Sequence, residues 1–338
     1  LSQAVYRQMT NYVLISVPLF IFMAALLERS GIARDMYSSL NIWLNRTRGG
    51  IAIVTSIMAV IMAAMSGIIG GEVVLLGLIA LPQMLRLGYN QNLAIGTICA
   101  SGSLGTMIPP SIVLIFYGLI TETSIKALFT ASFLPGFTLA SLFIIYIMVI
   151  TRLRPQDAPL PEPDPSDPPT SEKSLMFLGF LARFGLWITG ALFLRALFFT
   201  VTGENVIQEG VDPIFLGMVS NMPYIGAAFF ICLAIMYLVV GKERTQNGWE
   251  MGKGLIAPTI VIGVVLGSIY GGITGITEAA GMGVIAVFVI GLIRREMTFE
   301  IVWDSVMRTL KSTGTIIWVT IGAAALAAAY TLVGGPTY

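Results

Sequence analysis

Residues 49–89 read GGIAIVTSIMAVIMAAMSGIIGGEVVLLGLIALPQMLRLGY, and this stretch decides the fold. It holds two apolar arms, 49–65 and 73–87, on either side of a polar and glycine-rich turn. A helix that crosses a membrane needs roughly 20 apolar residues, so each arm is short for a full crossing. Non-helical backbone inside a membrane is tolerated only where protein or water covers it. The pattern therefore predicts a re-entrant hairpin over 49–87, with both ends on one side of the membrane.

The next apolar stretch predicts a broken helix. Residues 93–119 are long enough to span a membrane, but the segment SGSLGTMIPPS (101–111) interrupts them. Consecutive prolines remove two amide donors and leave upstream carbonyls without helical partners. Free carbonyls and Ser or Thr hydroxyls are oxygen ligands suited to Na⁺ in discontinuous membrane helices. Close packing of glycine and simple proline kinks are the structural alternatives. Two interruptions in close succession favour an ion or substrate site.

The whole chain has the composition of an integral membrane protein. Of its 338 residues, 56% are hydrophobic and only 11% are charged, and the mean hydropathy is +0.86. Soluble proteins carry roughly 25% charged residues, so a soluble core is excluded. Eight stretches approach the length of a membrane helix: 11–28, 93–119, 127–150, 175–201, 215–240, 254–272, 277–293 and 309–332. We therefore predict an all-α polytopic membrane protein, a bundle of transmembrane helices in a lipid bilayer.

The basic residues support the re-entrant hairpin independently of its length. If both arms start on the cytoplasmic side, most of the 19 Lys and Arg residues fall inside. Only Arg7 and Lys126 then fall outside, as the positive-inside rule requires. A full crossing in place of the hairpin would invert every later segment and move most of these charges to the wrong side.

Several function classes are excluded by what the sequence lacks. It has no histidine, which removes histidine-based catalytic triads and histidine-ligated metal sites. Its two cysteines, Cys99 and Cys232, lie in apolar runs and show no metal-ligand spacing. The net charge of +1 gives no indication of nucleic-acid binding. No GxxxxGK[ST] motif occurs, so coupling to an ion gradient is more natural than ATP hydrolysis.

The chain divides at a proline- and acid-rich segment that predicts an extended cytoplasmic linker. The predicted organisation is a first transport half (1–151), this linker (152–174), an extra helix pair (175–240) and the start of a second, incomplete half (250–338). Residues 7–31 align without a gap on 311–335, and the charge pattern orients these two helices in opposite directions. This is the trace that an inverted-topology transporter repeat leaves in sequence. We expect the chain to be a piece of a longer membrane protein.

Five segments together resemble a known family. They are PLFIFMAALLERSGIA (18–33), the hairpin (49–89), ASGSLGTMIPPSIVLIFYG (100–118), LFTASFLPG (128–136) and GGITGITEAAGMG (271–283). They are similar to the large membrane subunit of tripartite ATP-independent periplasmic (TRAP) transporters, the DctM family. The resemblance implies an inverted-repeat, elevator-type transporter in the bacterial inner membrane. It also implies Na⁺-coupled uptake of an organic anion, typically a carboxylate, with a periplasmic binding protein and a small four-helix membrane subunit as partners.

The resemblance also implies site residues. It assigns one Na⁺ site to the hairpin turn and the broken helix, which in this chain gives Ser66, Gly67, Ser103, Gly105, Thr106 and Pro109. We expect the substrate to bind beside them, at Gly70, Gly71, Pro110 and Ser111. The family's second hairpin and second Pro-Pro break are absent from this sequence.

The sequence does not decide the roles of two acidic residues. Glu72 stands where the family pattern leads us to expect a small residue. It could be an ionised Na⁺ ligand, a proton carrier or a neutral structural acid, and we favour the structural acid. Glu278, near the outer end of its helix, could cap that helix or be solvated.

Two rival functions are weighed against the transporter. An ion channel needs a pore and a selectivity filter, whereas discontinuous helices with a repeat favour alternating access. Another ion-coupled carrier remains an alternative of the same general kind. An intramembrane enzyme is disfavoured, because the chain has no histidine, no acids paired at helical spacing and no evident Ser-Lys dyad.

Overall fold

The computed structural model describes residues 6, 9–67, 69–161, 168–202 and 222–332. Throughout these residues the regular elements are helices, which confirms the prediction of an all-α protein. Seven of the described helices are long and apolar enough to cross a membrane. The polytopic membrane class is therefore confirmed.

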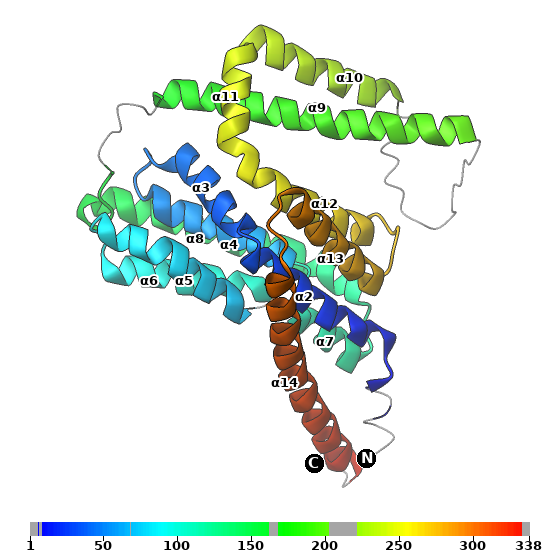
Figure 1. Ribbon diagram of the computed structural model, residues 1–338. Coiled ribbons are helices and arrows are strands. Elements are labelled where there is room, and N and C mark those ends of the chain that lie inside the picture. Colours follow the sequence, from blue (N-terminus) through cyan, green and yellow to red (C-terminus); the bar gives the residue numbers. More distant parts are fainter. Residues whose placement is uncertain (1–5, 7–8, 68, 162–167, 203–221, 333–338) are drawn as a thin grey trace.

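The first block is built around the buried helix α4. Its helices are α2 (Ser16–Arg29), α3 (Ile32–Leu44), α4 (Gly50–Ser66), α5 (Ile69–Arg86), α6 (Gln91–Gly102), α7 (Ile112–Thr121) and α8 (Ile125–Leu153). A short 3-10 turn, η1 (Tyr12–Ile15), precedes α2. Fourteen of the 17 residues of α4 are buried, because α2, α3, α5, α6 and α8 all pack against it. Figure 1 shows α4, α5, α6 and α8 running side by side.

The stretch 49–87 folds into two helices that pack against each other, α4 and α5. They are separated by Gly67 and by residue 68, which lies outside the described residues. Each helix is close to the length of its predicted arm. The entry of this hairpin into the membrane from one side stays a prediction.

The stretch 93–119 is divided into two helices at its prolines, as the sequence predicts. Helix α6 ends at Gly102, a 3-10 turn η2 follows over Ser103–Thr106, and α7 starts at Ile112. Pro109 and Pro110 lie between them, both buried and joined by a cis peptide bond. Neither proline has an amide hydrogen to continue a helix, so α6 and α7 are two separate helices.

Helices on both sides extend into the predicted linker, 152–174. Helix α8 continues to Leu153, a 3-10 turn η3 covers Pro155–Asp157, and α9 (Thr170–Thr202) begins four residues before the predicted end of the linker. The start of the linker also packs: the Asn90 amide donates to the Asp157 carbonyl (2.9 Å), and Ala158 is buried. Residues 162–167 of the predicted linker lie outside the described residues.

The predicted extra helix pair is part of a three-helix layer. Helix α9 packs against α10 (Met222–Ala234), the π-helical turn η5 (Ile235–Val240) and α11 (Lys242–Gly252). The first residues of the predicted span 215–240 are outside the described residues. Figure 1 shows this layer beyond the first block, with α11 descending from it towards α12. The Lys173 ammonium attaches the start of α9 to the end of α3, because it donates to the Ile42 carbonyl (3.0 Å) and the Asn45 side chain (2.7 Å).

The last block returns to the core. A 3-10 turn η6 (Lys253–Leu255) joins α11 to α12 (Ile256–Tyr270), which is followed by α13 (Ile276–Ile293) and α14 (Phe299–Leu332). Helix α2 packs against both α13 and α14. Beyond the α13 end, Arg294 hydrogen-bonds to Glu296 (2.9 Å) and to Asp35 of α3. These bonds, first the one to Glu296, raise the pKa of Arg294 above its usual value and keep it charged.

Candidate cation site at the hairpin turn

The turn between α4 and α5 docks into the break between α6 and α7. The Ile112 amide, at the start of α7, donates to the Gly67 carbonyl (3.3 Å). Gly67 has a positive φ of 62°, and a Cβ at this position would overlap the backbone carbonyl of Pro110. Only glycine therefore fits both the backbone conformation and the close approach.

Glu72 is enclosed at the same junction. It lies in the first turn of α5 with 0% of its surface exposed, and the Ser66 hydroxyl hydrogen-bonds to its Oε1 atom. Its Oε2 atom is also buried and has no hydrogen-bond partner among the described residues. Gly105 of η2 faces this carboxylate, since a Cβ on Gly105 would lie 2.8 Å from Oε2. The absence of a side chain at Gly105 makes room for the Glu72 carboxylate.

Four helix ends meet at this junction. Helices α4 and α6 end here and α5 and α7 begin here, so some of their terminal carbonyls and amides lack partners within a helix. The C-terminal ends carry partial negative charge and the N-terminal ends partial positive charge. The junction can therefore bind a cation with carbonyl oxygens and an anion with backbone amides.

The structure brings together only some of the residues predicted for Na⁺. Ser66, Gly67 and Gly105 lie around Glu72 and are buried, and Pro109 is buried in the break. Ser103 is exposed, and its hydroxyl donates to the Ala100 carbonyl (2.7 Å). The Thr106 hydroxyl donates to the Ser103 carbonyl (2.8 Å). Both hydroxyls thus donate to nearby backbone carbonyls of the same helical segment.

The residues predicted for the substrate differ in exposure. Gly70 is exposed and Gly71 is half-buried, so solvent reaches this side of the turn. Pro110 and Ser111 are buried, and the Ser111 hydroxyl donates to the Thr106 carbonyl (2.8 Å). In this arrangement only the two glycines are accessible.

Two charged residues at the turn were not foreseen from the sequence. The Glu28 carboxylate of α2 lies directly against Gly71, and Arg308 of α14 lies beside both. Arg308 Nη1 is 2.6 Å from Glu28 Oε2, and the Glu28 side chain is only 10% exposed. A neighbouring pair, Arg29 with Asp304 (3.0 Å), joins the same helices. The available signal was the Glu28-Arg29 pair at the end of an apolar helix together with Asp304 and Arg308 one helical turn apart.

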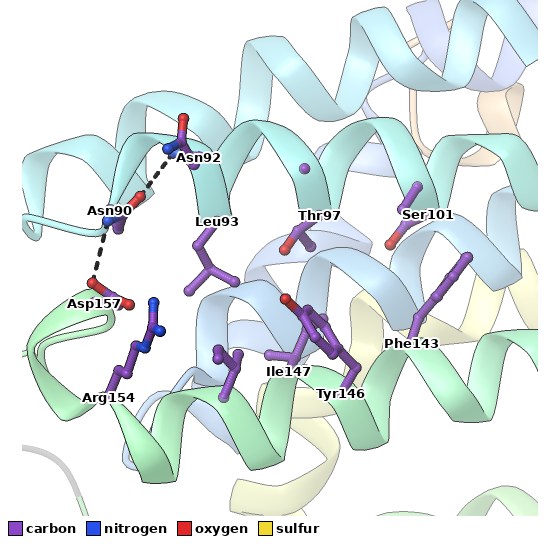
Figure 2. Close-up of a pocket in the computed structure, with 13 residues that line it drawn as sticks. Asn90, Asn92, Leu93, Thr97, Ser101, Phe143, Tyr146, Ile147, Arg154 and Asp157 are labelled. Atoms are coloured by element: carbon purple, nitrogen blue, oxygen red, sulfur yellow. Dashed lines mark hydrogen bonds between the residues drawn. The ribbon is translucent and has the colours of Figure 1, made fainter.

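A cavity of about 340 Å³ lies between α6 and α8, away from the turn. Figure 2 shows Thr97 and Ser101 of α6 facing Tyr146 and Phe143 of α8. The polar residues Asn90, Arg154 and Asp157 lie at one end, where Asn90 Nδ2 donates to Asp157 Oδ1 (3.2 Å). None of the predicted site residues lines this cavity, and it was not foreseen from the sequence.

The second glycine-rich turn, between α12 and α13, has a different setting. Glu278 lies in the first turn of α13, is exposed, and accepts a hydrogen bond from the Tyr12 hydroxyl (2.9 Å). A cavity of about 560 Å³ lies here, lined also by Thr123, Lys126 and Thr274. Glu278 is thus exposed at the start of α13 with its carboxylate beside the N-cap residue Gly275, and its role as a cap or as a solvated end stays a prediction.

Comparison with known proteins identifies the chain's relatives. The family model described as "Tripartite ATP-independent periplasmic transporter, DctM component" matches residues 1–338. The C4-dicarboxylate TRAP transporter large permease protein DctM of Pseudomonas aeruginosa is 34% identical over 154 residues, which cover 46% of this chain and 36% of that protein. The ectoine TRAP transporter large permease protein TeaC of Halomonas elongata is 33% identical over 141 residues, 42% of this chain and 33% of that protein.

A third relative has a different named substrate. The sialic acid TRAP transporter large permease protein SiaM of Vibrio cholerae is 28% identical over 135 residues, which cover 40% of this chain and 32% of that protein. Each of these matches spans about a third of the relative's length.

Proposed function

We propose a function for this chain from the premise that it belongs to the DctM component family of TRAP transporters, whose family model matches it throughout. The family is one of transport proteins rather than enzymes. We propose that the chain is part of a large permease subunit that takes up an organic anion together with Na⁺. The relatives named for C4-dicarboxylates support a carboxylate as the recognised group.

The observation that carries this proposal is the docking of the hairpin turn into the helix break. Ile112 at the start of α7 bonds to Gly67, and Glu72 is enclosed between Ser66 and Gly105. Discontinuous helices that meet at such a point are the usual sites of ions and substrates in secondary transporters.

The donor set of the junction suits Na⁺. The Ser66 hydroxyl donates its hydrogen to Glu72 and keeps lone pairs for a cation. The carbonyls at the C-terminal end of α4 and the unpartnered Glu72 Oε2 atom add further oxygens. Of the residues predicted for Na⁺, three lie where they can surround an ion beside Glu72: Ser66, Gly67 and Gly105. The hydroxyls of Ser103 and Thr106 donate to backbone carbonyls instead.

The anion has a complementary place on the open side of the turn. The first amides of α5 belong to Gly70, Gly71 and their neighbours, and a helix N-terminus favours negative charge. Arg308 lies beside Gly71 and is 42% exposed. We propose that the substrate carboxylate approaches this side.

The partners and the location follow from the same proposal. We propose that the subunit lies in the bacterial inner membrane and works with a small four-helix membrane subunit and a periplasmic binding protein. The three-helix layer of α9, α10 and α11 offers exposed apolar residues to lipid or to the small subunit, among them Trp187, Leu194 and Tyr237.

The test is uptake into proteoliposomes that contain the full-length permease with its small subunit. The binding protein is added outside, loaded with radiolabelled succinate as a C4-dicarboxylate probe, and ectoine and sialic acid are tested in parallel. We expect uptake of one of these compounds under an inward Na⁺ gradient. Equal uptake under a K⁺ gradient of the same size would contradict Na⁺ coupling, and conductance without the binding protein would favour a channel.

A further inference from the structure

We propose that Glu72 is a negatively charged ligand of the coupling cation, so that the ion bound at the hairpin turn is paired with a carboxylate. This inference rests on the Na⁺ coupling proposed above, and it replaces the neutral structural acid that the sequence alone favoured. It adds a residue that the family resemblance does not supply, because that resemblance leads us to expect a small side chain at this position.

The first support is the state of the two carboxylate oxygens. Oε1 has the Ser66 hydroxyl as its donor, whereas Oε2 is buried and has no partner among the described residues. A buried oxygen without a partner costs roughly 1–3 kcal/mol, and more if it is charged. The position beside Gly105 holds Oε2 in place at the helix break, where a bound ion would satisfy it.

The second support is the charge around Glu72. The charged side chains that lie beside the turn at Gly71, Glu28 and Arg308, are already paired with each other. Helices α4, α6 and α7 and the turn η2 contain no charged residue at all. The nearest basic residue on α5 itself is Arg86, about 21 Å further along the helix at 1.5 Å per residue.

Glu28 does not supply the positive charge that Glu72 lacks. Its carboxylate lies against Gly71 and is close enough to interact electrostatically with Glu72. An ionised Glu72 therefore has the Glu28–Arg308 pair as its neighbour and no basic side chain of its own among the described residues. A buried carboxyl group is ionised only when a positive charge is paired with it, and a bound cation supplies that charge.

The third support is the kind of cation that the ligands suit. The oxygens available are one carboxylate, one hydroxyl and backbone carbonyls, which are hard ligands. Among the described residues no three His, Cys, Asp or Glu side chains gather at one point. One carboxylate balances the charge of one monovalent cation, and Na⁺ is the monovalent cation proposed above.

The experiment measures Na⁺ binding without transport. The full-length permease, purified with its small subunit, is heated at increasing NaCl, with choline chloride keeping the ionic strength constant. The Na⁺ concentration that gives half of the Na⁺-dependent thermal stabilisation is compared among the wild type, Glu72→Gln, Glu72→Asp and Glu278→Gln. The Gln variant keeps the size of the side chain, and Glu278→Gln is a matched loss of one first-turn carboxylate in an exposed turn.

We expect Glu72→Gln to raise the half-saturating Na⁺ concentration about tenfold or more, and Glu278→Gln to match the wild type. Glu72→Asp keeps the charge but withdraws it by one methylene, so we expect a smaller rise. A half-saturating concentration in Glu72→Gln equal to that of the wild type overturns the proposal for Glu72 and leaves Na⁺ coupling intact. If Glu72→Gln fails to fold, an unchanged value in Glu72→Asp overturns it equally. A wild type without Na⁺-dependent stabilisation overturns the coupling proposal, and this inference falls with it.

Discussion

The chain contains two glycine-rich turns with an acid in the first turn of the following helix, and the fold treats them in opposite ways. At the α4–α5 turn, Glu72 is completely buried and one of its oxygens has no partner among the described residues. At the α12–α13 turn, Glu278 is exposed, points back towards Gly275 and accepts a bond from Tyr12. Similar local sequence thus gives an enclosed carboxylate in one place and a helix-terminal residue in the other.

This difference shows that the segment packed against a turn, and not the turn itself, determines whether the acidic side chain is buried. The α4–α5 turn is covered because the α6–α7 break offers it a gap, with Gly105 leaving room for a carboxylate. The α12–α13 turn lies beside a cavity and meets the exposed Tyr12. The following four predictions test this contrast.

Labelling of single cysteines should give an all-or-none difference between the two turns. With Cys99 and Cys232 replaced by alanine, Glu278→Cys should react with a membrane-impermeant thiol reagent added to intact cells. Glu72→Cys should not react, because the position is buried. Gln156→Cys, in the exposed η3 turn, should react only after the cells are opened. Reaction of Gln156→Cys from outside would overturn the orientation and the re-entrant hairpin with it.

Replacement by alanine should destabilise the protein much more at Gly67 than at Gly275. Gly67→Ala should destabilise the protein by about 3 kcal/mol, because φ is positive and the new methyl meets a backbone carbonyl that cannot move away. Gly275→Ala should cost no more than about 0.5 kcal/mol, because its φ is −69° and the new methyl meets only the mobile end of Glu278. The midpoints of thermal unfolding in detergent compare the two, and equal losses would contradict the tight docking of the first turn.

Removal of one hydroxyl should affect the ion site alone. Ser66→Ala takes away the hydrogen bond to Glu72, so the Na⁺ concentration for half-maximal uptake should rise roughly tenfold, equivalent to about 1.4 kcal/mol. Ser56→Ala is the matched control, because Ser56 is equally buried and bonds to Ser101 (2.8 Å) away from the turn. Unchanged Na⁺ dependence in a well-expressed Ser66→Ala variant would remove Ser66 from the site.

The smallest effect is expected at the exposed turn. Tyr12→Phe removes the hydrogen bond to Glu278, but both groups are exposed and water replaces the lost partner. Thermal stability and Na⁺ dependence should both stay within the scatter of the wild type. A clear shift in Na⁺ dependence would show that the second turn also contributes to ion binding.

The features that the sequence predicted well depend on local backbone chemistry. Prolines cannot donate amides, so the break between α6 and α7 follows from Pro109 and Pro110 wherever the helix packs. The hairpin follows from the lengths of two apolar arms around glycines. The grouping of Ser66, Gly67 and Gly105 agrees with the expectation that the turn meets the break, although their role with Na⁺ stays a proposal.

The features that the sequence could not supply depend on tertiary contacts. Nothing local distinguishes the enclosed Glu72 from the exposed Glu278. The beginning of the linker is held by a contact between Asn90 and Asp157, and the first turn of α9 is tied to the end of α3 by Lys173. Glu28 and Arg308 are 280 positions apart in the chain, so the charge pattern of each segment does not show that they meet at Gly71.

The two ion pairs between α2 and α14 also have a consequence for how the chain assembles. Neighbouring residues of opposite sign, Glu28 and Arg29, face Arg308 and Asp304, which are one helical turn apart. If α14 slid by one turn during insertion into the bilayer, Arg29 would meet Arg308, and the like charges would repel each other. Helix α14 has only two buried side chains, Ser305 and Thr309, so its packing gives little other information about its position. The two ion pairs therefore favour one register of α14 along α2, and so one depth of α14 in the bilayer.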